Sequence, residues 1–414
     1  MATTETRGAE ISPEAAVDQP SPRGPAWLRP AWLPPAWRTA ILAGGLAWVA
    51  SRLAYAIVNV LSWRAGHMSP PPTGQVLTAW ARWDTGHYLR IAEGGYGQVP
   101  LDNAFFPLYP LLIKIFNYVL PAEYLFSALV VSNLACLAGL VVFYRLTAFE
   151  LGDTVAQRTV FYLVAFPTAF FLGAAYNASL FLLLAAGTLY ALRQQKWWLA
   201  GVLAGLASAT RVSGILLALP FAYEYLRVCE FQWRRIRWNA LWIALVPSGL
   251  IAFSLYCWAA LGDVLAWSHA QTLWYRALDW PFVALWRTLR EALGARYTDG
   301  VLGELTIVNL TDFTAGVTFL TLLTLCLVGP WKLRRDQLYI VLYGFAALLL
   351  PMSTPATDTR PLISLSRHVL ECLPGFMILG RMGANRVFDR LYQMPAIALQ
   401  VCFLLIFMHY DWIA

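Results

Sequence analysis

The chain has 414 residues, of which 59% are hydrophobic and only 13% are charged. Soluble globular domains carry about 25% charged residues, so this composition excludes an ordinary soluble enzyme. The formal net charge is +7, but no basic run is long enough, and no soluble domain is present, to indicate nucleic-acid binding. The composition instead predicts a protein embedded in a membrane.

Residues 1–37 are rich in proline, alanine and acidic side chains, which predicts a disordered cytoplasmic N-terminal tail. Residues 38–414 are predicted to form one transmembrane domain, because apolar runs recur along their whole length. These runs have the length of helices and do not alternate with a period of two, which favours helices over a β-barrel. The predicted fold class is therefore an all-α polytopic membrane protein.

Eleven apolar runs are candidate membrane spans. They lie near residues 39–62, 125–147, 158–175, 177–193, 197–211, 212–227, 239–261, 312–329, 337–352, 367–380 and 394–411. Several are shorter than the ~20 residues of a straight crossing, so they either extend into their flanks or are broken helices around a cavity. Residues 105–120 are also apolar, but Pro107, Pro110 and Lys114 favour a re-entrant or interfacial segment.

The distribution of lysine and arginine sets the orientation. With the N-terminus inside, most of these residues fall in the short segments predicted to be cytoplasmic, as the positive-inside rule requires. The outer loops, about 63–124, 262–311 and 353–366, are then expected to carry short interfacial helices. We expect function on this outer face of a bacterial plasma membrane, or on the luminal face of the endoplasmic reticulum in a eukaryote.

A polar segment follows the first predicted span. Asp84 and His87 are three residues apart, so on a helix they share one face, with Arg82 on a neighbouring face. Gly94-Gly95 is expected to end this helix, and we expect Glu93 to turn toward the same cavity as Asp84. The alternative is a solvated interfacial helix, in which Asp84 only caps the helix or pairs with an arginine.

Two further clusters of polar residues stand at the outer ends of apolar runs. Arg211 at a membrane boundary is costly unless it is paired or reaches the headgroups, and snorkelling is its alternative reading. Arg367 beside His368 can bind a phosphate through a forked guanidinium and a second donor. Its alternative reading is an interfacial anchor that forms a salt bridge with Glu371.

The sequence has no Walker A loop, no HExxH and no GxSxG motif, and no domain that would bind a nucleotide. A group transfer on the outer face must therefore use a donor that is already activated and reaches that face. A lipid-phosphate-linked sugar meets both conditions. No metal-ligating cluster is visible, and no cofactor is obligatory because phosphate is a good leaving group. A divalent cation at Asp84 remains compatible with this chemistry.

A set of short motifs occurs in order between about residues 40 and 380. They are Trp83-Asp84-x-x-His87-Tyr88, Ile91-Ala92-x-x-Gly95-Tyr96, Phe105-Phe106-Pro107-x-x-Pro110, Phe166-Pro167-x-x-Phe170-Phe171, Tyr176-x-x-Ser179-Leu180-Phe181, Thr210-Arg211-x-x-Gly214 and Ser364-x-Ser366-Arg367. Together they resemble the PIG-V-like mannosyltransferases, which include the enzyme that adds the second mannose to the GPI anchor. One position departs from the family: Ala178 stands where the family usually has an acid, so the acceptor is expected to differ if that acid contacts it.

This family is part of the GT-C superfamily of polytopic glycosyltransferases. The resemblance therefore implies a GT-C-type bundle of about 11 transmembrane helices. It also implies an inverting transfer of mannose from a polyprenyl- or dolichyl-phosphate donor to an acceptor hydroxyl on the outer or luminal face. Asp84 matches the essential acid that these enzymes carry in their first large outer loop.

The candidate residues then take distinct roles. Asp84 is expected to be the general base for the acceptor hydroxyl, and His87 is expected to orient Asp84 or the acceptor, or to share the proton. Arg211, Arg367 and His368 are expected to stabilise the departing donor phosphate as its charge develops. The remaining substrate-binding candidates are Arg82, Trp83, Tyr88, Glu93 and Tyr176.

Other readings stay open. A transporter or flippase for a lipid-linked sugar would use the same cavity without chemistry, but it would more naturally show inverted repeats and acids along a path through the membrane. An accessory protein that has lost activity is a third reading. The acceptor is expected to be a glycolipid, a glycan or a protein, and mannose is expected from the resemblance alone.

Overall fold

The computed structural model describes residues 34–66, 73–298, 300 and 303–409. The predicted tail over 1–37 lies almost wholly outside the described residues, and its last residues begin the first helix. The helices are α1 Pro35–Gly66, α2 Thr73–Thr78, α3 Asp84–Gly94, α4 Leu108–Val119, α5 Tyr124–Leu151, α6 Asp153–Val164, α7 Ala178–Arg193, α8 Trp197–Ser208, α9 Ala218–Val228, α10 Ser248–Leu261, α11 Ala266–Thr272, α12 Pro281–Thr298, α13 Glu304–Leu327, α14 Leu338–Met352, α15 Leu365–His368, α16 Leu373–Met382 and α17 Arg386–Met408. Short 3₁₀ helices lie at Pro100–Ala104, Ala169–Leu172, Val212–Leu217, Trp233–Arg235, Trp238–Leu245, Arg335–Gln337 and Val369–Glu371.

The predicted all-α class is confirmed, because the described residues form helices and a single isolated β-bridge. Within the described residues, four helices are long and apolar enough to cross a membrane: α1, α5, α13 and α17. The 3₁₀ helix Trp238–Leu245 and α10 would form a fifth crossing, bent by 46°. The predicted number of eleven spans is not confirmed. Hydropathy does not separate a lipid-facing span from a shorter apolar helix that other helices enclose, and α7, most of whose residues are buried, is of this second kind.

Some predicted spans are broken. The run 158–175 is a helix only as far as Val164, and after Pro167 it continues as a short 3₁₀ helix. The run 367–380 divides between α15, a 3₁₀ turn and α16. Non-helical backbone at such depth is tolerated only where protein encloses it or where it lines a cavity.

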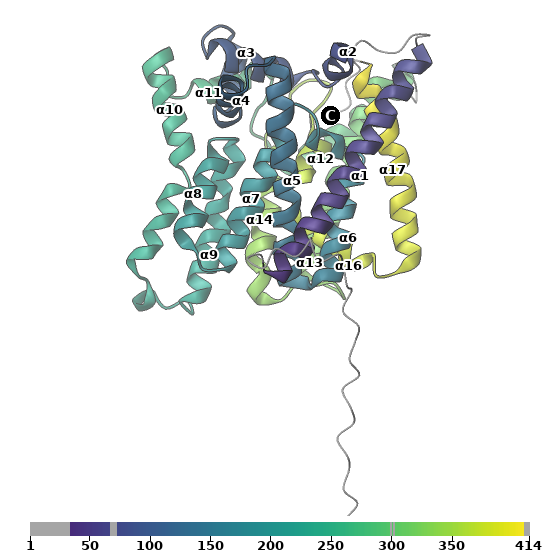
Figure 1. The fold of residues 1–414 in the computed structure, drawn as a ribbon. Helices are drawn as coiled ribbons and strands as arrows, with labels where there is room; N and C mark the ends of the chain where they lie inside the picture. Colours follow the sequence, from purple (N-terminus) through teal and green to yellow (C-terminus); the bar gives the residue numbers. More distant parts are fainter. Residues whose placement is uncertain (1–33, 67–72, 299, 301–302, 410–414) are drawn as a thin grey trace, which may run out of the picture.

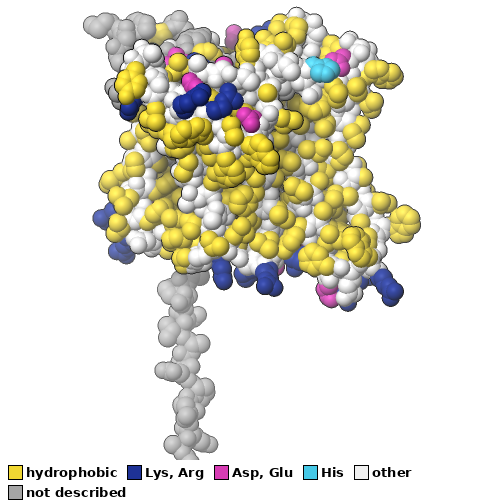
Figure 2. Space-filling model, turned by 180° about the vertical axis from the view of Figure 1, so that it is seen from behind, with side chains coloured by type: hydrophobic (Ala, Val, Ile, Leu, Met, Phe, Trp, Pro, Cys, Tyr) yellow, Lys and Arg dark blue, Asp and Glu magenta, His cyan; other side chains and the backbone are white. Residues whose placement is uncertain are grey.

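Figure 1 shows that the helices run between two ends of the bundle. The short helices α3, α4 and α11 lie together at one end, which we call the α3 end. With 12 residues at 1.5 Å per residue, α4 is too short to cross a bilayer and is not among the long apolar helices. Figure 2 shows a broad hydrophobic band between the two ends and many lysine and arginine side chains at the end opposite α3.

Close packing around α5 forms the centre of the bundle, where α5 contacts α1, α6 and α7. Gly139 allows this approach, since a Cβ atom there would lie 3.3 Å from the backbone nitrogen of Leu183 on α7. Fully buried aromatic side chains fill the spaces between helices, among them Phe143, Tyr144 and Phe181.

A buried ion network ties helices together at the end opposite α3. Arg193, in the last turn of α7, contacts Glu150 of α5 at 2.8 Å, Glu224 of α9 at 3.5 Å and Asp336 at 2.5 Å. The side chains of Glu150 and Glu224 are 0% exposed. The hydroxyl group of Tyr339 also donates to Glu150 at 2.8 Å. One guanidinium thus bridges carboxylates from three separate parts of the chain, and Arg227 and Arg334 supply further positive charge to them.

Replacing Arg193 by methionine is expected to destabilise the protein strongly. The change keeps the length of the side chain but leaves Glu150 and Glu224 buried without this partner, and breaking a buried pair costs about 3–5 kcal/mol. The matched control is Arg235→Met, which removes an exposed pair with Glu230 worth about 0–1 kcal/mol. Melting temperatures in detergent compare the two variants, and equal shifts would contradict the structural role of Arg193.

Candidate active site

A cavity of about 480 Å³ opens at the α3 end of the bundle. Its wall comes from α3, α11, α14 and α15 together with the loops between them. The charged and imidazole side chains that line it are Asp84, Arg211, Arg276, Arg367, His368 and Glu371. The cavity therefore gathers residues from three of the predicted polar segments into one place.

Asp84 begins α3 and lies 12% exposed in the cavity wall. Its atom Oδ2 accepts a hydrogen bond of 2.8 Å from Nη1 of Arg367. The first turn of a helix also favours a negative charge. No described residue donates to the other carboxylate oxygen, Oδ1. Asp84 thus has one oxygen fixed by an arginine and one free to act on a bound molecule.

Arg367 is fixed from several sides. The backbone N–H of Ser366 donates to Oδ1 of Asp312 on α13 at 2.8 Å, and the hydroxyl group of Thr168 donates to the Ser366 carbonyl at 2.6 Å. The guanidinium lies over the rings of Phe171 and Tyr176, at 5.3 and 5.0 Å from their centroids. These contacts hold the side chain that in turn orients Asp84.

Arg211 connects two other cavity residues. Its Nη1 pairs with Oε1 of Glu371, and its Nη2 donates to Nε2 of His368. A guanidinium only donates, so Nε2 must accept and the imidazole proton sits on Nδ1. Burial and the nearby Arg367 guanidinium lower the pKa of Arg211 to about 10.

Steric constraints require the glycine of the Thr210-Arg211-x-x-Gly214 motif. A Cβ atom at Gly214 would lie 2.3 Å from the backbone of Ala207 and Ser208 at the end of α8. Only glycine lets the 3₁₀ helix Val212–Leu217 close against α8 in this way. The close approach fixes the turn from which Arg211 reaches the cavity.

His87 does not contact Asp84 in the structure. Its Nδ1 lies 2.5 Å from Oδ1 of Asp102, which is fully buried and also accepts from Arg90 at 2.8 and 3.2 Å. The ring stacks on Phe105, with 4.4 Å between centroids. Since Phe105 lines the cavity, His87 supports the wall from behind, and its predicted catalytic role stays a prediction.

The remaining predicted substrate contacts divide into two groups. Tyr88 lines the cavity, whereas Tyr176 lies fully buried beside it under Arg367. Arg82 donates to the carbonyl groups of Thr78 and Met408, outside the cavity wall. Trp83 is 40% exposed and does not line the cavity either.

The expectation that Glu93 faces the cavity is wrong. Glu93 is exposed and does not line the cavity. Nine residues correspond to two and a half helical turns, so Glu93 points away from the face that carries Asp84. The expected end of the helix is confirmed, because α3 ends at Gly94 and Gly95 takes a positive φ of 77°.

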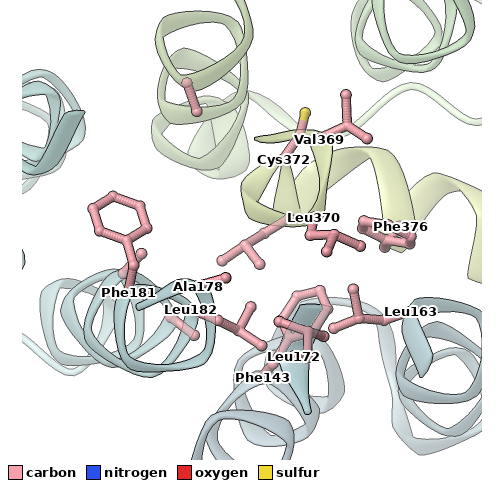
Figure 3. Packing of buried hydrophobic residues seen from close by; sticks show 14 of the residues in the cluster. Phe143, Leu163, Leu172, Ala178, Phe181, Leu182, Val369, Leu370, Cys372 and Phe376 are labelled. Carbon is pink, nitrogen blue, oxygen red and sulfur yellow. The ribbon is translucent and has the colours of Figure 1, made fainter. Parts of the chain in front are cut away.

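Ala178 lies in the hydrophobic core rather than in the cavity wall. It is 2% exposed, and Figure 3 shows it among buried apolar side chains that include Leu182 and Leu370. Its neighbour Asn177 lines the cavity and donates to the Thr210 carbonyl at 3.0 Å. Ala178 itself therefore does not contact the cavity.

Among the described residues, no group of three or more His, Cys, Asp and Glu side chains could hold a metal ion. The two carboxylates of the cavity, Asp84 and Glu371, are each paired with an arginine. The donor set thus does not resemble a metal site, and the divalent cation that the chemistry tolerates stays an expectation.

Three cavity residues instead carry polar atoms that have no partner among the described residues. These buried atoms are Nδ1 of His368, Nε1 of Trp274 and Oγ of Ser213. Buried polar groups are nearly always hydrogen-bonded, so their position around one cavity indicates a binding site.

Sequence reasoning missed Arg276, Asp102 and Asp312. Arg276 and Asp102 lie in long loops of ordinary composition, where nothing in the local pattern distinguishes them. Of these three residues, only Asp312 could have been recognised from the sequence. It is a carboxylate at the edge of an apolar run, and placing a charged side chain in a membrane costs free energy.

Residues 72–259 match a family model described as Mannosyltransferase (PIG-V). GPI alpha-1,6-mannosyltransferase 2 of Cricetulus griseus is 32% identical over 151 residues, which are 34% of this chain and 30% of that protein. GPI mannosyltransferase 2 of Aspergillus fumigatus is 27% identical over 282 residues, which are 61% of this chain and 57% of that protein. The matches thus span less than two thirds of either relative.

Two solved structures resemble the fold at low sequence identity. ArnT from Cupriavidus metallidurans, solved with undecaprenyl phosphate, aligns with 88% of this chain and 76% of its own at a TM-score of 0.48 and 13% identity. The oligosaccharyltransferase of Archaeoglobus fulgidus, solved with zinc and sulfate, aligns with 87% of this chain and 53% of its own at a TM-score of 0.43. The family model and the two GPI mannosyltransferases confirm the predicted resemblance of this integral membrane protein to the PIG-V mannosyltransferases.

Proposed function

We propose that this protein is a membrane glycosyltransferase that moves mannose from a lipid-phosphate-linked donor to an acceptor hydroxyl. The observation that carries the proposal is the cavity, which Asp84 lines together with three arginine side chains. The match to the PIG-V family model supports mannose as the transferred sugar. The proposed site is the α3 end of the bundle, on the outer face of a bacterial plasma membrane.

The free Oδ1 of Asp84 is the proposed general base. An inverting transfer needs one base that takes the proton of the acceptor hydroxyl while that oxygen attacks the anomeric carbon from the side opposite the phosphate. General bases contribute about 10²–10⁴-fold when they lie within hydrogen-bond reach of the proton. Arg367 fixes the other oxygen, so the carboxylate meets the acceptor in one orientation.

The departing lipid phosphate needs positive charge and hydrogen-bond donors where its charge develops. Arg211, Arg367 and His368 remain the predicted donors to this group. Two of them are already engaged, because Arg367 pairs with Asp84 and Arg211 pairs with Glu371. Both guanidinium groups carry five N–H donors, so each keeps capacity for a phosphate oxygen.

The acceptor is proposed to be a glycolipid, a glycan or a protein with an accessible hydroxyl group. A lipid-linked sugar carrier is the second candidate, because the same cavity would bind the donor without reacting. What favours the enzyme is the position of Asp84, whose carboxylate lies in the cavity wall where a general base could reach an acceptor hydroxyl. An assay of transfer separates the two.

The substitution Asp84→Asn is expected to reduce mannose transfer by about 10²–10⁴-fold. It is also expected to lower the melting temperature, because Arg367 loses its buried counter-charge while the protein keeps its fold. The amide oxygen still accepts from Arg367, but it takes no proton from the acceptor. The measurement uses the full chain in detergent, radiolabelled polyprenyl-phosphate mannose and a membrane lipid extract.

Asp263→Asn is the control, because Asp263 is an exposed acid that pairs with His269 outside the cavity. Its transfer activity should equal that of the wild type. Transfer by Asp84→Asn within threefold of the wild type would contradict the assignment of the base. Donor binding without transfer by the wild type, after other sugars and acceptors are tried, would support the carrier.

Asp312→Ala is expected to lower kcat/KM on the order of 10²-fold, because small displacements of a positioned group carry penalties of this size. The change removes the acceptor that holds the Ser366 N–H and thereby the segment that carries Arg367. Asp312→Asn keeps an oxygen at this place and should retain most of the activity. Equal losses in both variants would show that the charge of Asp312, and not the hydrogen bond, is what matters.

A further inference from the structure

We propose that Arg276 is the residue that binds the phosphate of the lipid-linked donor, assisted by neutral hydrogen-bond donors of the same cavity. This inference rests on the proposed function, which supplies the donor. It differs from the sequence expectation, because it moves the centre of the phosphate site away from Arg367.

Arg276 is the cavity arginine that has no acidic partner. Arg367 pairs with Asp84 and Arg211 pairs with Glu371. No carboxylate of the described residues lies within 4.0 Å of the Arg276 guanidinium, which nevertheless lines the cavity. The ion pairs leave one positive charge in the cavity uncompensated, and an anion of the ligand can balance it.

The backbone of Arg276 is fixed before any ligand binds. It forms an antiparallel β-bridge with Ala356, which joins the loop after α11 to the loop after α14. On one side of the bridge the N–H of Thr357 donates to the Tyr275 carbonyl at 2.8 Å. Two outer loops that are about 80 residues apart in the chain therefore hold this arginine between them.

The guanidinium is oriented as well. Its Nη1 donates to the carbonyl of Thr354 at 3.1 Å, and its Nη2 lies 3.5 Å from the carbonyl of Ile363. Two of its five N–H groups are thus occupied and the others remain for a ligand. Burial and the positive charge of Arg367 lower the pKa of Arg276 to about 10, so the side chain is still cationic at neutral pH.

The unpaired polar atoms of the cavity match a phosphate. Because Nε2 of His368 accepts from Arg211, its Nδ1 carries a proton that no described residue accepts. The Nε1–H of Trp274 and the hydroxyl of Ser213 are likewise buried without a partner in the described chain. The imidazole and indole groups can only donate here, and the non-bridging oxygens of a phosphodiester can only accept. Such a set favours a phosphate over a sugar, whose hydroxyl groups need acceptors too.

The test measures binding of a polyprenyl monophosphate to the full chain in detergent, without transfer. The wild type is expected to bind it more tightly than the uncharged polyprenol. Arg276→Gln, which keeps two N–H donors but removes the charge, should weaken binding of the phosphate by about 10-fold or more and leave the polyprenol unaffected. The affinity of Arg276→Lys for polyprenyl monophosphate should lie between those of the wild type and Arg276→Gln. Arg290→Gln, an exposed arginine of α12 outside the cavity, is the control.

Inorganic phosphate forms a separate arm of the same experiment. Competition by inorganic phosphate that depends on Arg276 would show that the site binds the phosphate group itself. Competition by polyprenyl phosphate alone would show that binding also needs the polyprenyl chain. Either result supports the inference. Wild-type affinity of Arg276→Gln for polyprenyl phosphate, with a melting temperature equal to that of the wild type, would overturn it.

Failure of this inference can be distinguished from failure of the proposed function. Binding that depends on Arg276, in a protein that transfers no mannose, would keep the phosphate site and reject the enzyme. Mannose transfer with an unchanged KM for the donor in Arg276→Gln would keep the enzyme and reject the phosphate site. Circular dichroism shows whether Arg276→Gln or Arg276→Lys is misfolded. The affinity of the folded variant for polyprenyl monophosphate then tests the phosphate site.

Discussion

The ion pair between Asp84 and Arg367 joins two segments that are 283 residues apart in the chain. Its energy depends on the surroundings, because a buried pair gains from low dielectric only when its geometry is good and its other atoms are satisfied. Asp312, Thr168 and Tyr176 supply these conditions by fixing the backbone and the face of the arginine. The wall of the cavity therefore depends on a contact that neither segment makes alone.

The two ends of the molecule use charge differently. At the end opposite α3, Arg193 is surrounded by acids, and its charge is paired with carboxylates of the protein itself. At the α3 end, the arginines of the cavity outnumber their acids and hydrogen-bond donors remain without partners. The first arrangement favours stability, and the second favours a ligand that brings its own negative charge.

The sequence was sufficient for those features that depend on local chemistry. Four helices could be placed because each contains an 18-residue window of high mean hydropathy, as α1 and α5 do. Asp84, Arg211 and Arg367 could be recognised as candidates because charged residues at the ends of apolar runs are costly unless they are paired or functional. Arg276 could not, since its importance comes from the missing acid beside it, and only the fold reveals which arginines are paired.

The β-bridge at Arg276 and Ala356 makes loop length a constraint on this protein. The bridge pairs single residues, so inserting one residue between α11 and the bridge would either strain this connection or change which residue pairs with Ala356, and both would disturb the position of Arg276. Substitutions in these loops would be tolerated far better than a shift in register. An engineer who exchanges residues in these two loops should therefore leave the lengths of both loops unchanged.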